Sequence, residues 1–268
     1  MSDTANPDRT LDPDSAVEEE VRDGAQERSR MGFLDHLDEL RRRLLYSVYA
    51  IVAGCIPPFF YWERIFTYMA KYFGRYGAKL IYTQPMGAFM FSMQICLLAG
   101  VIIASPFVFS QLWLFVAPGL YAKEKRVVIP FVLLSSMLFA AGAAFSHFVA
   151  FPSMWQFFAS YDGMGGLQFF PTIDDTFGFY VKMILGLGLV FQMPLLVYFL
   201  ARFGIVSAKF MLKQFRYAIL IIVIVAAVIT PSADIVNQLI FAAPMVVLYV
   251  ISIGVAWIFG RKKKPAAD

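Results

Sequence analysis

The stretch Trp113-Leu-Phe-Val-Ala-Pro-Gly-Leu-Tyr-Ala-Lys-Glu-Lys-Arg126 lies between two long apolar runs and decides how the chain is organised. Aromatic residues beside a basic cluster are typical of a membrane span that ends at the cytoplasmic interface. The pair Pro118-Gly119 predicts a turn, because proline fixes φ and glycine permits a positive φ. One carboxylate, Glu124, lies among three basic residues. The stretch is therefore predicted to be a cytoplasmic loop between two membrane spans.

The composition agrees with a membrane protein. The chain has 268 residues, of which 59% are hydrophobic and only 16% are charged, and its mean hydropathy is +0.65. Soluble domains are about 45–50% apolar. A β-barrel would show alternating segments of about ten residues, whereas these apolar runs are continuous. We predict an all-α membrane protein.

Six apolar runs follow one another along the chain, at residues 44–61, 87–113, 127–151, 176–200, 218–229 and 237–259. The fifth run would reach only about 18–24 Å, short of a hydrocarbon core of roughly 30 Å. We therefore expect short fifth and sixth helices, either in a locally thinned bilayer or as a hairpin against the protein. Cys55 and Cys96 fall inside the runs, which favours buried free thiols over disulfides. No cysteine or histidine has a neighbour at metal-ligand spacing.

Charge divides the chain into three predicted regions. Residues 1–30 carry nine acids and four arginines and are expected to be a disordered acidic tail. Residues 31–259 form the membrane domain, and residues 260–268 form a basic cytoplasmic tail. The inner connections hold most of the lysines and arginines, so both termini are expected in the cytoplasm. Residues 62–86, an outer loop with four basic residues, are the exception.

Local patterns predict several contacts. An amphipathic helix at Gly32–Leu45 precedes the first span, with Asp38–Arg42 and Glu39–Arg43 as i,i+4 ion pairs. Pro57-Pro58 should kink or end that span near its outer end. Thr172 or the two aspartates that follow it can cap the fourth span.

These residues resemble a known family. His36-Leu-Asp-Glu-Leu-Arg-Arg-Arg-Leu44 is similar to the box before the first span of TatC, the receptor subunit of the twin-arginine (Sec-independent) protein translocase. The stretch from Ser105-Pro106 to Arg126 looks like the first cytoplasmic loop of that family. Thr230-Pro231-Ser-Ala-Asp234 and Ala243-Pro244 resemble its last outer loop and last helix. The resemblance covers about residues 31–259.

The resemblance implies a cup-shaped protein of six helices in the bacterial cytoplasmic (inner) membrane. It implies a receptor that binds twin-arginine signal peptides of folded precursors for transport driven by the proton gradient. Partners would be single-span TatA/TatB-type subunits within a larger complex that can include a homo-oligomer. No catalysis, cofactor, metal or nucleic acid is implied. The signal-peptide site would comprise Glu39, Glu124, Phe115, Pro118 and Arg41, and Pro231 and Asp234 would be structural residues of the outer loop.

The two site carboxylates also have simpler interpretations. Two carboxylates suit two arginines, because guanidinium–carboxylate pairing can be bidentate. Glu124 could instead stabilise the third span through the helix dipole at its N-terminus. Glu39 could instead only form an ion pair with Arg43.

Gln192, a polar residue in the middle of the fourth span, and the nearby Pro194 suggest a docking point for a partner helix. The alternative is an internal hydrogen bond to backbone freed by Pro194. A secondary transporter of a small solute is the rival function. It would usually show internal repeats and an ionisable group at mid-membrane depth, and neither is found in the sequence.

Overall fold

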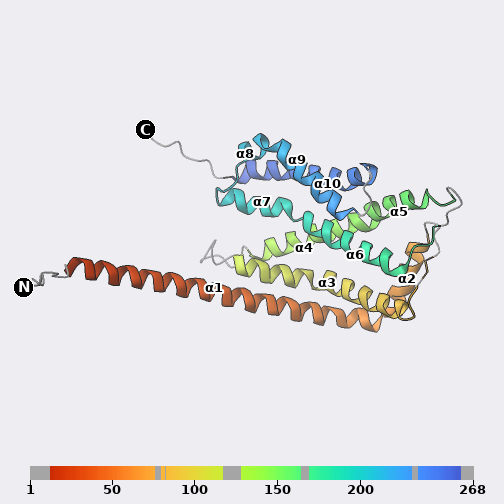
Figure 1. The fold of residues 1–268 in the computed structure, drawn as a ribbon, viewed down its shortest axis with the longest axis horizontal. Helices are drawn as coiled ribbons and strands as arrows, with labels where there is room; N and C mark the ends of the chain where they lie inside the picture. Colours follow the sequence, from red (N-terminus) through yellow and green to blue (C-terminus); the bar gives the residue numbers. More distant parts are fainter. Residues whose placement is uncertain are drawn as a thin grey trace, which may run out of the picture.

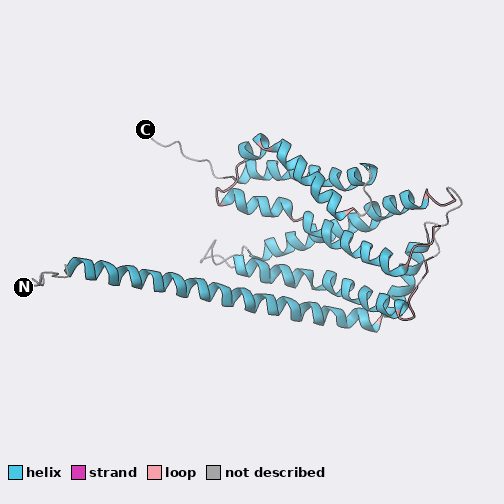
Figure 2. Cartoon of the chain, viewed as in Figure 1, coloured by secondary structure: helices cyan, strands magenta, loops and turns pink. Residues whose placement is uncertain are grey.

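The computed structural model describes residues 13–75, 80–81, 83–116, 128–163, 169–230 and 235–260, and the regular elements in these ranges are helices (Figure 2). In chain order they are α1 (Pro13–Phe60), α2 (Trp62–Gly74), α3 (Gly87–Val116), α4 (Val128–Phe145), the π-helical turn η3 (Ser146–Ala150), α5 (Phe151–Ala159), α6 (Ile173–Val190), α7 (Met193–Arg202), α8 (Ala208–Lys213), α9 (Phe215–Ile229) and α10 (Ile235–Phe259). The all-α prediction is confirmed.

Among the described residues, five helical segments are long and apolar enough to cross a membrane. They are His36–Phe60, Gly87–Phe115, Ile129–Ala159, Ile173–Arg202 and Ile235–Phe259. With the shorter α9 they correspond to the six predicted runs. The helices run side by side between two ends of the molecule (Figure 1), with α1 packed on α3, α3 on α4, α4 on α6, and α10 on α7 and α9.

The two ends differ in what they carry. The C-terminal ends of α3 and α7 lie at one end, together with α8 and the start of α4 (Figure 1). Helix α2 and the end of α5 lie at the other end. Arg202, Lys209 and Lys213 belong to the first end, which is the one predicted to face the cytoplasm. The cup shape and the orientation in the membrane stay predictions.

Two predicted lengths are corrected. Helix α9, of 15 residues, is about 22 Å long and confirms the short fifth helix. Helix α10 has 25 residues and is about 37 Å long, so the prediction of a short sixth helix is wrong. Its apolar sequence continues through Pro244 without a break in the helix. The third span is also longer than predicted, because the helix continues as α5 to Ala159.

Helix α5 continues the span directly from the π-helical turn η3, with Pro152 as its second residue. Phe151, Met154 and Trp155 are buried on one face of this segment. Their burial adds an apolar stripe to residues that looked like an outer loop. Thr172 caps α6 as predicted, because its side-chain oxygen accepts a hydrogen bond from the Asp175 N–H group at 3.2 Å.

The first helix is longer than its apolar run. Helix α1 begins at Pro13, so residues 13–30 of the acidic segment are helical where composition predicted disorder. Alanine, glutamate and arginine in that segment are good helix formers, which explains the difference. The helix ends at Phe60, two residues after Pro57-Pro58, as predicted. The boundaries of the acidic tail, membrane domain and basic tail stay predictions.

Small residues bring α1 and α3 into close contact. A Cβ atom on Gly54 would lie 2.7 Å from the carbonyl oxygen of Gly100, too close for any side chain. Close approach through glycine is a common way for membrane helices to pack. This contact fixes the distance between the two helices that carry the candidate site.

Candidate functional site

Glu39 lies on α1 and already has a partner. Its Oε1 atom is 3.3 Å from a terminal nitrogen of Arg43, and the two side chains are 31% and 28% exposed, respectively. The predicted i,i+4 pair is therefore confirmed. A partly exposed i,i+4 pair of this kind stabilises a helix by only about 0.3–0.5 kcal/mol. The carboxylate is held weakly and remains accessible to solvent.

The second predicted pair, Asp38–Arg42, does not form. The Nε atom of Arg42 instead donates to the Tyr46 hydroxyl at 3.2 Å, and its guanidinium lies 5.6 Å from the centre of the Tyr46 ring. The aromatic ring offers Arg42 both a hydrogen bond and a cation–π contact. Arg42 therefore turns away from the acids of α1.

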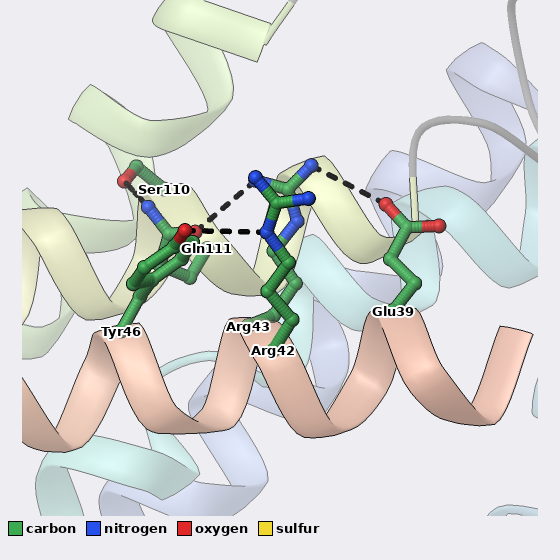
Figure 3. A network of polar contacts seen from close by, with 6 residues as sticks. All are labelled: Glu39, Arg42, Arg43, Tyr46, Ser110 and Gln111. Carbon is green, nitrogen blue, oxygen red and sulfur yellow. Dashed lines mark hydrogen bonds and ion pairs between the residues drawn. The ribbon is translucent and has the colours of Figure 1, made fainter.

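Arg43 also connects α1 to α3. Its other terminal nitrogen donates to Gln111 Oε1 at 3.2 Å, across 68 residues of sequence. Gln111 is buried, with 7% of its surface exposed, and its amide nitrogen lies 3.5 Å from the Ser110 hydroxyl. Figure 3 shows the network, in which Arg43 lies between Glu39 and Gln111. One guanidinium thus holds a carboxylate of α1 and an amide of α3 at once.

A ring contact fixes the end of α3 beside the same turn of α1. The His36 and Phe115 rings are stacked, with centroids 4.4 Å apart and planes inclined by 16°. His36 precedes Glu39 by three residues, about one helical turn. The chain leaves α3 directly after this contact, at Val116. The end of α3 therefore lies next to the turn that carries Glu39.

The other predicted site residues fall into two groups. Arg41 is exposed on α1. Glu124 and Pro118, and likewise Pro231 and Asp234, lie outside the described residues. The structure therefore brings Glu39, Arg43 and Phe115 together with Gln111, and the position of Glu124 relative to them stays a prediction.

Gln192 lies in the short break between α6 and α7. Its amide nitrogen donates to the backbone carbonyl of Ser135 on α4 at 2.9 Å, and the Ser135 hydroxyl accepts from the Trp113 ring nitrogen at 2.6 Å. Pro194 is buried in the first turn of α7. The side chain thus makes an internal hydrogen bond, although to a neighbouring helix and not to backbone freed by Pro194. Docking of a partner helix at this point stays a prediction.

A second polar cluster was missed by the sequence analysis. His147, in the π-helical turn η3, lies with Nδ1 at 2.7 Å from the Tyr180 hydroxyl and Nε2 at 3.2 Å from the Tyr68 hydroxyl. The Tyr72 hydroxyl donates to the His147 carbonyl, and the two rings stack. The cluster joins α2 and α6 to the third span, and α2 lies at the end of the molecule opposite the C-terminal end of α3 (Figure 1). Its sequence signal was a lone histidine within an apolar run.

Comparison with known proteins decides the family. The family model described as Sec-independent protein translocase protein (TatC) matches residues 35–244. The chain belongs to the TatC family. The resemblance inferred from the sequence motifs is confirmed.

Relatives and solved structures agree. The TatC protein of Koribacter versatilis is 42% identical over 242 residues, covering 87% of this chain and 88% of the relative. The TatC protein of Helicobacter pylori strain J99 is 40% identical over 223 residues, covering 82% of this chain and 87% of the relative. A crystal structure of the twin-arginine translocase receptor TatC matches with a TM-score of 0.71 at 31% identity, covering 82% of this chain and 97% of that one. A second, in DDM, matches with a TM-score of 0.73 at 30% identity, covering 85% of this chain and 100% of that one.

Membership has direct consequences. TatC is a protein-transport family and not an enzyme family, and it works within a translocase complex. The chain is a multi-pass membrane protein of that family. Membership favours protein translocation over the rival interpretation of a small-solute transporter.

Proposed function

We propose that this protein is the receptor and core subunit of a twin-arginine translocase, which moves folded proteins across the cytoplasmic membrane using the proton gradient. The observation that carries the proposal is that two contacts hold the end of α3 beside Glu39. These contacts are the His36–Phe115 ring stack and the Arg43–Gln111 hydrogen bond. The chain that leads to Glu124 therefore leaves α3 beside Glu39. Similar solved structures are described as twin-arginine translocase receptors, which supports the same function.

Two carboxylates on one surface suit a ligand with two adjacent arginines. Each carboxylate can accept one guanidinium through charge-assisted hydrogen bonds, and the planar fork of arginine matches a carboxylate better than an ammonium does. Glu39 is half-exposed and can be reached from solvent. We propose that Phe115 and Pro118 set the position of the loop, and that Arg41 contributes to the same surface.

The proposal includes an orientation and partners. Both termini lie in the cytoplasm of a bacterium, and the site faces the cytoplasm at the inner membrane. Single-span TatA/TatB-type subunits dock near Gln192 and Pro194, where α6 and α7 are separated by a break. Pro231 and Asp234 shape the outer loop between α9 and α10.

The test is precursor binding to the full-length protein in nanodiscs. Glu39→Gln and Glu124→Gln, singly and together, are compared using an Arg-Arg signal and the same signal with Lys-Lys. Loss of a charge-assisted hydrogen bond costs about 1.5–3 kcal/mol, so each single variant should weaken Arg-Arg binding roughly ten- to hundredfold. The Lys-Lys signal should lose much less, and the double variant should show little remaining preference for arginine.

Asp38→Asn is the matched control, because Asp38 is an exposed carboxylate on the same turn of α1. It should change binding of the two signals slightly and equally. If Glu39→Gln and Glu124→Gln also weaken both signals equally, the carboxylates hold the shape of the surface, and the proposed recognition of arginine is wrong.

A further inference from the structure

The cationic surroundings of Glu39 pose a problem that the structure addresses. Arg41, Arg42 and Arg43 follow Glu39 on α1 and should repel a ligand with two arginines. Arg42 is engaged with Tyr46, and Arg41 is exposed. Arg43 alone of the three is paired with Glu39. The carboxylate that should receive a ligand guanidinium is therefore already occupied by one from the protein.

The bonds of Arg43 are divided between two acceptors. One terminal nitrogen bonds Glu39 Oε1 at 3.3 Å, and the other bonds the buried Gln111 Oε1 at 3.2 Å. The Nε atom of Arg43 is buried without a hydrogen-bond partner among the described residues. Glu39 is therefore engaged through one oxygen by one nitrogen, and not through the two parallel bonds that a guanidinium can make with a carboxylate.

This arrangement allows Arg43 to give up Glu39 at small cost. The pair is about 30% exposed on both sides and is made by one nitrogen and one oxygen 3.3 Å apart, and i,i+4 pairs within a helix are weak. If Arg43 leaves Glu39, its bond to Gln111 can remain. A ligand guanidinium that binds Glu39 in the bidentate manner uses both carboxylate oxygens, and so it competes with Arg43 for Oε1.

We propose that Arg43 is a resident counter-ion of the signal site. It occupies Glu39 in the empty receptor, rests on Gln111 while a ligand arginine holds the carboxylate, and competes for Glu39 again when the ligand leaves. Arg43 thus lowers the affinity for the signal and speeds its release, and Gln111 determines how easily Arg43 moves aside. This inference rests on the proposed function of Glu39 as a signal-binding carboxylate.

Arginine and lysine ligands should respond differently to Arg43. An ammonium is a point charge that can use the second oxygen of Glu39 while Arg43 keeps the first. A bidentate guanidinium uses both oxygens and therefore competes with Arg43 directly. Removing Arg43 should therefore help an Arg-Arg signal more than a Lys-Lys signal.

The experiment measures equilibrium and dissociation rates for both signals with the full-length protein in nanodiscs. Arg43→Gln should tighten Arg-Arg binding about twofold, the factor that corresponds to a weak i,i+4 ion pair. The change should appear mainly as slower dissociation. The gain for the Lys-Lys signal should be smaller.

Arg42→Gln is the matched control, because it removes the same charge from the next position without touching Glu39. It should give small gains that are equal for the two signals. Gln111→Met removes the second acceptor of Arg43 and should weaken Arg-Arg binding about two- to fivefold, since Arg43 then relies on Glu39. In the Arg43→Gln background, Gln111→Met should have no further effect, and this non-additivity tests the coupling.

Weaker Arg-Arg binding by Arg43→Gln, or gains that equal those of Arg42→Gln for both signals, would overturn the inference. Thermal unfolding of each variant checks the fold. If Arg43→Gln does not fold, Arg43→Lys takes its place, because one ammonium cannot span Glu39 and Gln111. The Glu39→Gln variant separates the two proposals. If it leaves binding unchanged, the proposed site itself is wrong, whereas if it weakens binding and Arg43→Gln gives no gain, only the counter-ion role is wrong.

Discussion

The His36–Phe115 stack offers a direct test of how the site is held. Phe115→Leu removes a ring contact with centroids 4.4 Å apart while keeping an apolar side chain at the end of α3. An aromatic pair of this geometry contributes about 0.5–1.5 kcal/mol beyond its buried area. If that energy keeps the following loop beside Glu39, its loss lowers the fraction of receptor that is ready to bind. The apparent affinity for an Arg-Arg signal should then fall about two- to twelvefold.

The assay is precursor binding in nanodiscs with both signals. The loss should be the same for Arg-Arg and Lys-Lys, because Phe115→Leu leaves both carboxylates in place. His36→Ala should give a similar loss, and the double variant should be no worse than either single variant. Phe107→Leu, the same exchange at an exposed position of α3, is the control and should leave binding unchanged.

Two results would refute the reasoning. If His36→Ala has no effect while Phe115→Leu weakens binding, Phe115 acts without its partner on α1, for example by contacting the ligand. If Phe115→Leu changes the preference for Arg-Arg over Lys-Lys, the ring contributes to selectivity and does more than position the loop.

Three further outcomes are expected. His147→Phe should lower the free energy of unfolding by about 1–3 kcal/mol in thermal or denaturant unfolding, because the buried Tyr180 hydroxyl loses its described hydrogen-bond partner. Gln192→Leu should weaken association with a partner subunit in co-purification and leave precursor binding largely intact. If the variant behaves like the wild type in both assays, the role of Gln192 is the structural hydrogen bond to Ser135. Lengthening α9 by about one helical turn of leucines should impair transport into vesicles without abolishing membrane insertion, because a 15-residue helix favours a thinned bilayer.

The first of these has its own control. Tyr68 is exposed, so Tyr68→Phe removes the bond to His147 Nε2 while leaving its other partner, Tyr180, unaffected. It should cost clearly less than His147→Phe. Equal costs would mean that the hydrogen bond to Tyr180 adds little to stability.

Much of the fold could be predicted from the sequence because the bilayer imposes strong local rules. Each span must be a run of apolar residues long enough to cross the hydrocarbon, and helices satisfy their own backbone hydrogen bonds. The six runs and the short α9 followed from this. Contacts within one helix were also predictable, as with Glu39–Arg43, because a spacing of four residues fixes their distance.

Local rules failed where another partner competes. Arg42 was expected to pair with Asp38, and it bonds Tyr46 instead, because the spacing of four residues allows both partners. The third span was expected to end near residue 151, and it continues through α5 because Phe151, Met154 and Trp155 find buried positions against other helices. Burial by neighbours cannot be read from the run itself.

The sequence alone determined the family, the spans and the carboxylate on α1, since these depend on residues close together in the chain. Only the tertiary structure decided what surrounds that carboxylate. Arg43 meets Gln111 across 68 residues and His36 meets Phe115 from a different helix, and both contacts exist because α1 and α3 pack closely at Gly54. Distances between helices depend on packing that no single segment encodes. The contact of Arg43, the partner of Glu39, with its second acceptor Gln111 could therefore be seen only in the tertiary structure.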